Sequence, residues 1–245
     1  GLSVWDRIEE WDEDSARPPG RQDEVAPEEA QTFLAEILGS GAETRPAQFA
    51  YAASATHAFR ARARREENAI LLAEAGTGLG KTLGYLAPAS LWAEKNGPGL
   101  WISTYTRNLQ RQIMQEMTRL YPDPVERDDK VVVRKGRENY LCLLNFEDAA
   151  KRTALGPGQR AVALGLIARW IAATPDGDLS GSGFPAFLAA SVPLRELTDR
   201  RGECIYAACP HYRICFIECG LHRAKNAPRV IANHALVMAQ AMTQG

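Results

Sequence analysis

The stretch EAGTGLGKTLGYLAPA, residues 74 to 89, is a glycine-rich turn that runs into an apolar segment. A phosphate-binding loop needs glycines so that successive backbone N–H groups face the phosphates, a lysine that reaches the β and γ phosphates, and a Ser or Thr hydroxyl on Mg2+. All three features are present, which predicts a nucleotide site with Lys81 and Thr82 as its catalytic residues. The candidate cofactor-binding residues in the loop are Gly76, Thr77, Gly78, Gly80, Lys81 and Thr82.

The sequence around the loop has the order of strand, loop and helix that a phosphate loop requires. Residues 69–75, AILLAEA, predict a buried strand, and residues 81–92 predict the helix that follows. The N-terminus of that helix points its positive end at the same anion. One residue departs from the strict pattern, since Ala75 stands where the first glycine is expected. The context favours a phosphate loop over a chance glycine-rich turn with a surface lysine.

The segments after the loop alternate between short apolar runs and amphipathic stretches, which is typical of an α/β domain with a mostly parallel sheet. Residues 99–105 and 130–134 predict two further strands, and residues 106–120 between them predict a helix with one apolar face. The alternation then stops, and residues 139–220 are expected to be mainly helical. Residues 229–238 contain a β-branched run followed by a possible helix, which indicates a return to the first sheet.

The composition is that of an ordinary globular protein, with 45% hydrophobic and 24% charged residues among 245. The net charge of −1 excludes a uniformly basic nucleic-acid binder, but local basic surfaces stay possible because the acidic residues are concentrated in the first 30 positions. The longest apolar runs, such as residues 161–167, end well before the ~20 residues that span a bilayer, and no signal-peptide pattern is present. We therefore expect a cytoplasmic protein with no membrane partner.

Four segments are expected along the chain. Residues 1–44 are rich in acid and proline and are interpreted as an acidic N-terminal extension, the alternative being a regulatory arm that mimics nucleic acid. Residues 45–138 form the first part of the α/β domain, residues 139–220 a second domain, and residues 221–245 the return to the first.

All five cysteines follow the phosphate loop. In a reducing cytosol they favour metal ligands or free thiols over a disulfide framework. The last four could form the two C-x2–4-C-like pairs of a zinc site, whereas an iron-sulfur cluster takes four thiolates in a wider choice of spacings, so that a remote cysteine could join. The spacing of the cysteines alone is compatible with both a zinc site and an iron-sulfur cluster. His211 and His222 are near enough in sequence to be ligands, although a surface or core role is favoured for each. The cysteines are Cys142, Cys204, Cys209, Cys215 and Cys219.

Several segments resemble those of one group of helicases, in the same order along the chain. The phosphate loop, with Glu74 and Ala75 in front, resembles the form found in superfamily 2 helicases; residues 45–48 (RPAQ) resemble its Q motif and residues 103–113 (STYTRNLQRQI) its motif Ia. Other segments resemble the iron-sulfur helicases of the XPD and DinG type, of which the DinG type is the closer bacterial match. These are KGRENYLC (135–142), WIAATPDGDL (170–179), the cysteines from 204 onward, and NHALV (233–237).

This resemblance covers about residue 45 to the end and implies an α/β fold. It implies a partial RecA-like P-loop motor domain, a parallel sheet with flanking helices, into which a mainly helical iron-sulfur cluster domain is inserted. The implied activity is that of an ATP-dependent DNA helicase moving 5' to 3', with ATP, Mg2+ and a [4Fe–4S] cluster as cofactors. Gln48 is implied to contact the adenine edge. The implied cluster ligands are Cys142, Cys204, Cys209 and Cys215, with Cys219 as a bystander, although Cys219 in place of Cys215 stays open.

Basic residues near motif Ia and near the cysteines are candidates for DNA contacts. By composition alone such groups are more typical of solvated helix faces. Nearby tyrosines, which can stack on bases, and the resemblance favour a DNA role. The expected partners are single-stranded DNA and forked or displaced-strand DNA, bound by a monomer at the bacterial nucleoid. The candidate DNA-binding residues are Arg107, Asn108, Arg111, Lys135, Arg137 and Tyr140.

A motor of this type also needs an Asp-Glu box to hold Mg2+ and position water. The family's DEAH sequence does not occur in the 245 residues, so we expect the N-terminal portion of a longer protein, inactive alone. The alternative is a nucleotide-dependent DNA-binding or adaptor module with a structural metal site and no motor activity. A small zinc-containing kinase or GTPase fits the phosphate loop but leaves residues 103–113 and 233–237 unexplained.

Overall fold

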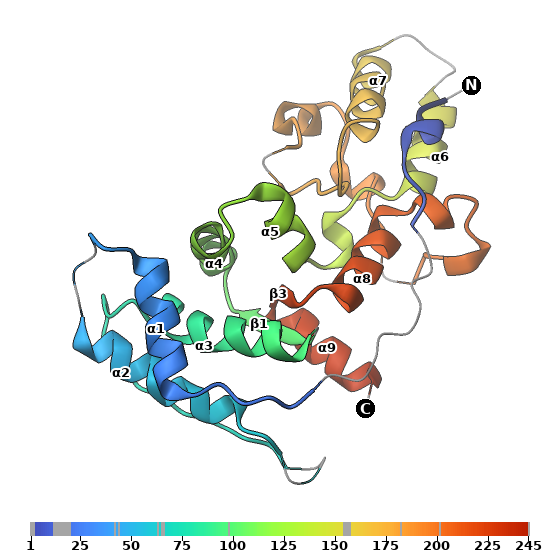
Figure 1. Cartoon of the computed structure of the whole chain (residues 1–245). Coiled ribbons are helices and arrows are strands. Elements are labelled where there is room, and N and C mark those ends of the chain that lie inside the picture. The colour runs from blue at the N-terminus through green and yellow to red at the C-terminus, as the bar shows by residue number, and fades with distance from the viewer. Residues whose placement is uncertain are drawn as a thin grey trace. The chain divides into compact units, whose positions relative to one another are not determined.

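The computed structural model (Figure 1) describes residues 3–11, 21–41, 43, 45–62, 64, 67–97, 99–153, 158–181, 183–200 and 202–244. The chain divides into two compact units, and each is described by itself. The sheet unit comprises residues 16–133 and 224–245, and the cysteine unit comprises residues 1–15 and 134–223. Within the described ranges, no helix combines the length and the apolar character that crossing a bilayer requires.

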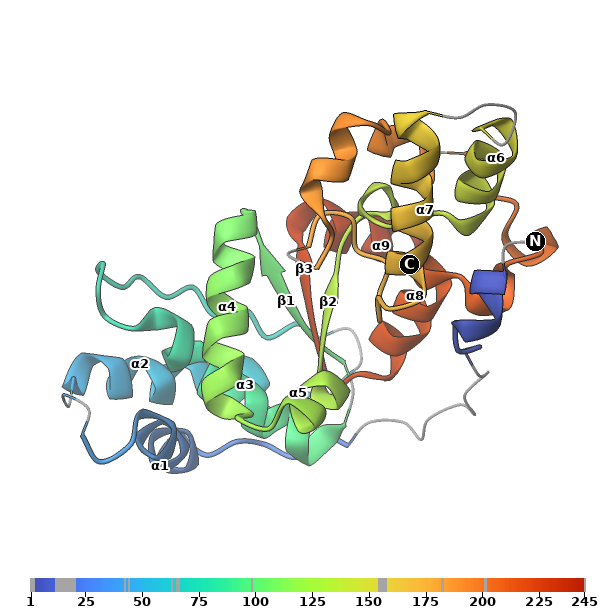
Figure 2. The ribbon, with the colours of Figure 1, turned by 90° about the horizontal axis from the view of Figure 1, so that it is seen from above.

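A small parallel sheet organises the sheet unit (Figure 2). Its strands β1 (Leu100–Thr104), β2 (Val131–Arg134) and β3 (Arg229–Asn233) lie in the order β1-β3-β2. Strands β1 and β3 run parallel, with Ile102 opposite Ile231. The central strand is suited to its place because Val230, Ile231 and Ala232 are small or β-branched and are fully buried. The predictions of strands at 99–105, at 130–134 and at the start of 229–238 are thus confirmed.

Helices cover this sheet and extend from it. They are α1 (Pro27–Leu38), α2 (Pro46–Ala55), α3 (Lys81–Asn96), α4 (Arg107–Leu120), α5 (Pro124–Lys130) and α9 (His234–Gln244), with a 3-10 turn η2 (Thr56–Phe59). Helix α4 begins where the Thr106 hydroxyl accepts the N–H of Leu109 at 3.1 Å, and it packs on the sheet through Ile113 and Met117. The predicted apolar face of residues 106–120 is therefore confirmed.

The prediction of a buried strand at residues 69–75 is wrong. The structure has no strand there, and Ile70 and Leu72 are 80% and 92% exposed. A strand that is apolar on both faces is buried only where neighbouring strands complete its hydrogen bonds and other layers cover it. Among the described residues, the sheet supplies no strand that pairs with this segment. The sequence pattern identified the apolar character of residues 69–75 correctly. It does not contain the information whether a neighbouring strand pairs with them.

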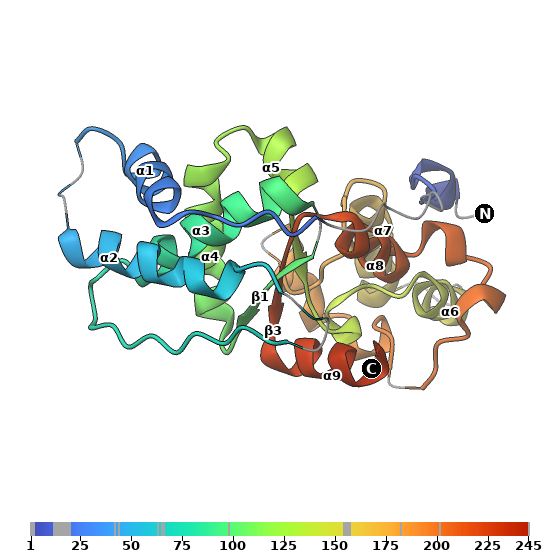
Figure 3. The same cartoon turned by 60° about the horizontal axis from the view of Figure 1, so that its bottom comes forward.

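Part of the acidic segment packs into the sheet unit. Helices α1, α2 and α3 lie side by side (Figure 3), and Leu34 of α1 is fully buried against Ala52 and Leu83. Upstream of α1, the backbone N–H of Asp23 donates to Asn96 Oδ1 at 2.6 Å, and Asn96 Nδ2 donates back to Asp23 O at 2.9 Å. The buried residues of α1 were not recognised in the sequence because acidic side chains dominate the segment.

The described part of the cysteine unit is built from helices and 3-10 turns. Its helices are α6 (Leu143–Thr153), α7 (Gln159–Ile171) and α8 (Phe216–Asn226, which ends beyond the unit), with 3-10 turns η1 (Ser3–Arg7), η3 (Arg137–Asn139), η4 (Ala186–Ala190), η5 (Leu194–Glu196), η6 (Tyr206–Ala208) and η7 (Tyr212–Ile214). Its core joins Phe146 of α6 and Ile167 of α7 to Leu197, all of them buried. Val4, Trp5 and other apolar residues of the N-terminal segment pack on the same core.

Candidate nucleotide and metal sites

The glycine-rich loop of the sheet unit has the backbone of a phosphate-binding turn. Gly78 and Gly80 both have φ of 80°, a left-handed conformation that residues with a Cβ adopt only at a cost. Gly80 is also the residue from which α3 starts, so that Lys81 and Thr82 lie in the first turn of that helix. The free N–H groups and positive end of α3 are therefore available to an anion at the position the sequence predicted.

Lys81 is folded back onto the loop. Its Nζ donates to the carbonyl oxygens of Ala75 and Gly76, each at 2.9 Å. These carbonyls satisfy two of the three donors of the ammonium group and hold it against the loop. A bound phosphate would compete for the same ammonium, which is the arrangement expected for a phosphate-reaching lysine.

The RPAQ segment contacts the loop directly. The buried Gln48, on α2, donates from Nε2 to Gly80 O at 2.9 Å, and Arg45 donates from Nη1 to Gly78 O at 2.6 Å. A Cβ added to Gly80 would lie 2.3 Å from Gln48 Nε2, so a larger residue at position 80 would have to displace the Gln48 amide as well as adopt a left-handed conformation. Arg45 was not among the predicted site residues, although it belongs to the same four-residue segment as Gln48.

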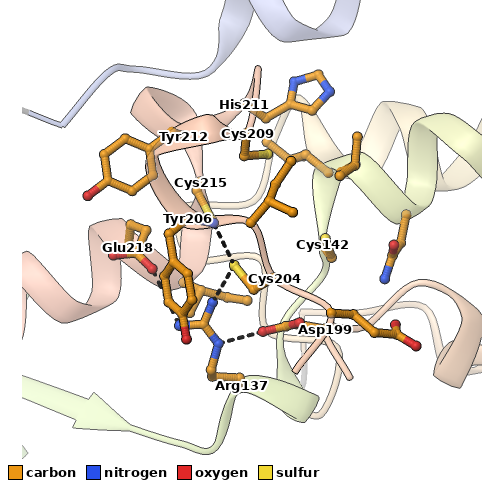
Figure 4. Close-up of a pocket in the computed structure, with 16 residues that line it drawn as sticks. Arg137, Cys142, Asp199, Cys204, Tyr206, Cys209, His211, Tyr212, Cys215 and Glu218 are labelled. Atoms are coloured by element: carbon orange, nitrogen blue, oxygen red, sulfur yellow. Dashed lines mark hydrogen bonds and ion pairs between the residues drawn. The ribbon is translucent and has the colours of Figure 1, made fainter. Parts of the chain in front are cut away.

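One cavity in the cysteine unit brings four of the five cysteines together (Figure 4). It encloses about 510 Å3 that protein atoms do not occupy, part of it open to solvent. Its lining includes Arg137, Asp199, Tyr206, His211 and Glu218, while Cys219 is not part of it. The four cysteines that line it are Cys142, Cys204, Cys209 and Cys215.

Two of these cysteines precede helices. Cys142 stands directly before α6, and the N–H groups of Leu144 and Asn145 hydrogen-bond its sulfur. Cys215 stands directly before α8 in the same way. A helix N-terminus stabilises a thiolate, but burial is the larger effect here: it raises the pKa of Cys142 above its usual value and that of Cys215 to about 11. These groups are thus neutral thiols at neutral pH until a cation displaces their protons.

Cys204 is held by a buried charge network. Arg137 Nη2 donates to Cys204 Sγ at 3.0 Å, while its Nε donates to Asp199 at 2.5 Å and its Nη1 to Glu218 at 3.3 Å, as the dashed lines of Figure 4 show. Burial alone would lower the pKa of Arg137, but its hydrogen bond to Asp199 raises that pKa above its usual value. A permanent cation therefore lies beside the Cys204 sulfur.

The candidate metal donors of this cavity are cysteine sulfurs. Among the described residues, no group of three or more His, Cys, Asp or Glu side chains is placed to hold one metal ion. A [4Fe–4S] cluster takes four thiolates, one on each iron, so its ligands surround a group of atoms instead of meeting at one point. Four thiols around one cavity have the donor number and the chemistry that such a group requires.

The two histidines near the cysteines have structural partners. His211 Nε2 lies 2.7 Å from Glu147 Oε2, and its ring is 4.7 Å from that of Trp5. His222 stacks on Trp11 at 3.9 Å. These contacts are consistent with the surface or core role that the sequence favoured for each histidine.

The predicted DNA-binding residues fall into two sets, one in each unit. In the sheet unit, Asn108 and Arg111 are exposed on α4, where Arg111 Nη2 donates to Asn108 Oδ1 at 2.8 Å; the side chain of Arg107 lies outside the described part of the structure. In the cysteine unit, Lys135 pairs with Asp178.

The remaining two residues of that second set face inward. Arg137 binds the carboxylates and sulfur described above. Tyr140 is only 7% exposed, and its hydroxyl accepts the N–H of Lys135 at 3.2 Å. In this conformation the Tyr140 ring offers no face to a base, whereas Tyr206 on the same unit is 59% exposed.

The parallel α/β sheet and the glycine-rich loop that leads into α3 are the features of this chain that P-loop proteins share. Comparison with known protein sequences indicates a narrower relationship. No family model matches the chain. The chain is 32% identical over 69% of its length to the ATP-dependent DNA helicase YoaA of Haemophilus influenzae, covering 26% of that protein. It is 30% identical over 85% of its length to the ATP-dependent helicase DinG of Mycobacterium tuberculosis, covering 33%. It is 29% identical over 84% of its length to the 3'-5' exonuclease DinG of Bacillus subtilis, covering 21%.

These homologues confirm the resemblance to DinG-type helicases. The chain spans between a fifth and a third of the length of these curated relatives. It is therefore similar to a part of each of them.

Proposed function

We propose that this chain is the nucleotide-binding and cysteine-bearing part of an ATP-dependent DNA helicase of the DinG type. The observation that carries the proposal is the phosphate loop, in which Lys81 and Gly80 begin α3 and Gln48 holds Gly80 from α2. The names of the homologues support the same activity for the whole protein. The expected translocation from 5' to 3' belongs to this proposal.

Each loop residue has a defined task in the proposed nucleotide site. On binding ATP, the Lys81 ammonium exchanges the carbonyls of Ala75 and Gly76 for β and γ phosphate oxygens. The N–H groups of the turn and of the first turn of α3 bind the same phosphates, and the Thr82 hydroxyl binds Mg2+. Gln48, which already contacts the loop, is proposed to read the adenine edge.

The four cavity cysteines are proposed to hold a [4Fe–4S] cluster, in a cluster domain that spans residues 139–220. When bound, the cluster supplies a covalent link among the segments that carry Cys142, Cys204, Cys209 and Cys215. Arg137 donates to one of the four sulfurs and the N-termini of α6 and α8 to two others, so the chain itself offsets negative charge on three of them.

Single-stranded, forked or displaced-strand DNA is the proposed partner, bound by a monomer at the bacterial nucleoid. Asn108 and Arg111 are solvent-exposed and are proposed to contact the DNA backbone. Phosphate contacts of this kind weaken with salt at about −0.7 in the logarithmic slope per phosphate neutralised on a single strand. Arg111→Ala should therefore lower affinity equally for all sequences and make the slope shallower. Lys225→Ala, which removes another exposed cation, is the matched control.

Binding of ATP tests the nucleotide site most directly. Calorimetry with Mg2+ and a non-hydrolysable ATP analogue should give binding by the 245-residue chain that Lys81→Ala abolishes and Lys225→Ala preserves. Equal binding by the parent chain and Lys81→Ala would contradict the proposal. Hydrolysis by this chain alone is proposed to be slow, because none of its residues form the DEAH sequence that holds Mg2+ and positions water. Rapid turnover would instead favour an ATPase other than a DinG-type motor.

A further inference from the structure

The described N-terminal residues lie against the loop that joins Cys209 to Cys215. The backbone N–H of Trp11 donates to Arg213 O at 3.0 Å, and its indole Nε1 donates to Tyr212 O at 2.9 Å. More than two hundred positions separate Trp11 from these residues in the sequence, and both ends of the contact belong to the cysteine unit. In Figure 4 the pale blue ribbon of the N-terminal segment passes above His211.

Aromatic contacts reinforce these two hydrogen bonds. Trp11 is 7% exposed, stacks on His222 of α8 at 3.9 Å with an interplanar angle of 16°, and meets the Tyr212 ring edge-on at 5.2 Å. Trp5 contacts the His211 ring at 4.7 Å and the Phe146 ring of the core edge-on at 6.1 Å. The N-terminal segment thus connects the loop to the core on one side and to α8 on the other.

The loop itself has little regular structure to hold it. Its backbone hydrogen bonds are local turns, from Tyr212 N to Cys209 O at 3.0 Å and from Cys215 N to Tyr212 O at 3.2 Å. His211 and Tyr212 line the cavity together with both cysteines, so the loop is also a wall of the cavity. The position of Cys209 and Cys215 therefore depends on what packs against the outer side of this loop.

We infer that Trp5 and Trp11 are positioning residues that hold the Cys209–Cys215 loop closed on the cavity and thereby slow the loss of the group that the four cysteines bind. The identity of that group rests on the proposed function. The closure itself does not, because it rests on the contacts that Trp5 and Trp11 make with the loop. It predicts that loosening this contact exposes two of the cavity cysteines more than the others.

Alkylation of the metal-free chain, followed residue by residue with mass spectrometry, tests this inference. Trp11→Ala should raise the alkylation rates of Cys209 and Cys215 by about tenfold, the factor that corresponds to the loss of about 1.4 kcal/mol of contacts. The alkylation rate of Cys142, which precedes α6 rather than lying in the loop, should not change. Trp11→Phe keeps a ring against His222 but loses the indole donor, so it should give an intermediate increase.

Controls separate a local opening from a general loss of structure. Trp92→Ala removes a tryptophan of the sheet unit that packs on Phe59, and it should leave the alkylation of Cys209 unchanged. Equal acceleration at Cys142 and Cys209 in both Trp11 variants, or no acceleration at any cysteine, would overturn the inference. If Trp11→Ala fails to fold, the selective increase in Trp11→Phe decides the question.

Iron release from the anaerobically purified protein to a chelator gives the second readout. Trp11→Ala should release iron about tenfold faster than the parent, with Trp11→Phe between them. A parent protein that contains no iron would refute the proposed cluster, while the alkylation pattern would still support or refute the closure. Unchanged iron release in a variant whose Cys209 is alkylated faster would show that the loop does not control retention.

Discussion

Gln48 Nε2 donates a hydrogen bond to the carbonyl oxygen of Gly80 at 2.9 Å, across 32 positions of sequence. The contact fixes α2 against the residue from which α3 starts, so the shape of the phosphate loop depends on a segment that is not part of it. The same side chain occupies the space that a Cβ on Gly80 would need.

Gly80→Ala should abolish nucleotide binding and destabilise the sheet unit. The alanine must adopt φ near 80° at a cost of about 1–2 kcal/mol, and its Cβ must also displace Gln48. Gly97→Ala is the matched control, because Gly97 has φ of 85° but nothing within 4 Å of an added Cβ. Calorimetric ATP binding and urea unfolding measure the two effects. Similar losses of binding in both variants would contradict the role assigned to the Gln48 contact.

Four of the five cysteine-to-serine variants should lose the cluster, and the fifth should keep it. Serine at position 142, 204, 209 or 215 should each remove the cluster, whereas Cys219→Ser should retain it, because Cys219 does not line the cavity. Iron, sulfide and zinc are measured per chain on protein purified without oxygen, together with visible absorption. The parent should contain about four iron and four sulfide. Zinc without sulfide in the parent, or loss of iron in Cys219→Ser, would contradict the assignment.

Arg137→Met should destabilise the cysteine unit by about 3 kcal/mol. It leaves the carboxylates of Asp199 and Glu218, whose side chains are 6% and 10% exposed, buried without their cation. Arg200→Met is the control, since the Arg200–Glu203 pair is exposed and its loss should cost less than about 1 kcal/mol. Denaturant unfolding measures both. If Arg137 served DNA alone, as its place in the candidate DNA-binding set suggested, the stability of the two variants would be equal.

Glu94→Gln should destabilise the sheet unit at neutral pH but not in acid. Glu94 Oε1 lies 2.8 Å from Nη2 of the fully buried Arg229 and 3.1 Å from Lys130 Nζ. Burial alone would raise the pKa of Glu94, but the hydrogen bonds from Arg229 and Lys130 bring it below its usual value. A lowered folded-state pKa means that the stabilisation is complete above the unfolded-state pKa of about 4.3 and disappears as pH falls through the folded-state value.

The expected loss in Glu94→Gln is about 1–2 kcal/mol at neutral pH. Hydrogen bonds to charged groups contribute up to about 3 kcal/mol, and exposure of 44% of the Glu94 side chain lets water screen part of that contribution. Unfolding measured from neutral pH to about pH 3 should show the parent and the variant converging in acid. Glu126→Gln, which removes the other partner of Lys130, should cost less than about 1 kcal/mol. A constant difference between parent and Glu94→Gln across this range would contradict the assignment.

The sequence predicted the local features of the fold better than its boundaries. Three strands and helix α4 occur where apolar periodicity placed them, but residues 69–75 have the same apolar character and are exposed. Composition separated residues 1–44 from the rest, yet Leu34 is in the core of the sheet unit and Trp11 in that of the cysteine unit. Periodicity and composition describe what a segment can bury, whereas its partner is set by the rest of the chain.

By itself, the sequence determined the phosphate loop, because the required glycines, lysine and threonine are contiguous and their conformations are a local property of the backbone. It also determined which cysteines were candidates, though not which would face one another. Only the tertiary structure decided that Gln48 reaches Gly80, that four cysteines line one cavity without Cys219, and that Trp11 holds the loop beside it. These contacts join segments far apart in the sequence, and such contacts form only when the buried faces of many elements pack together.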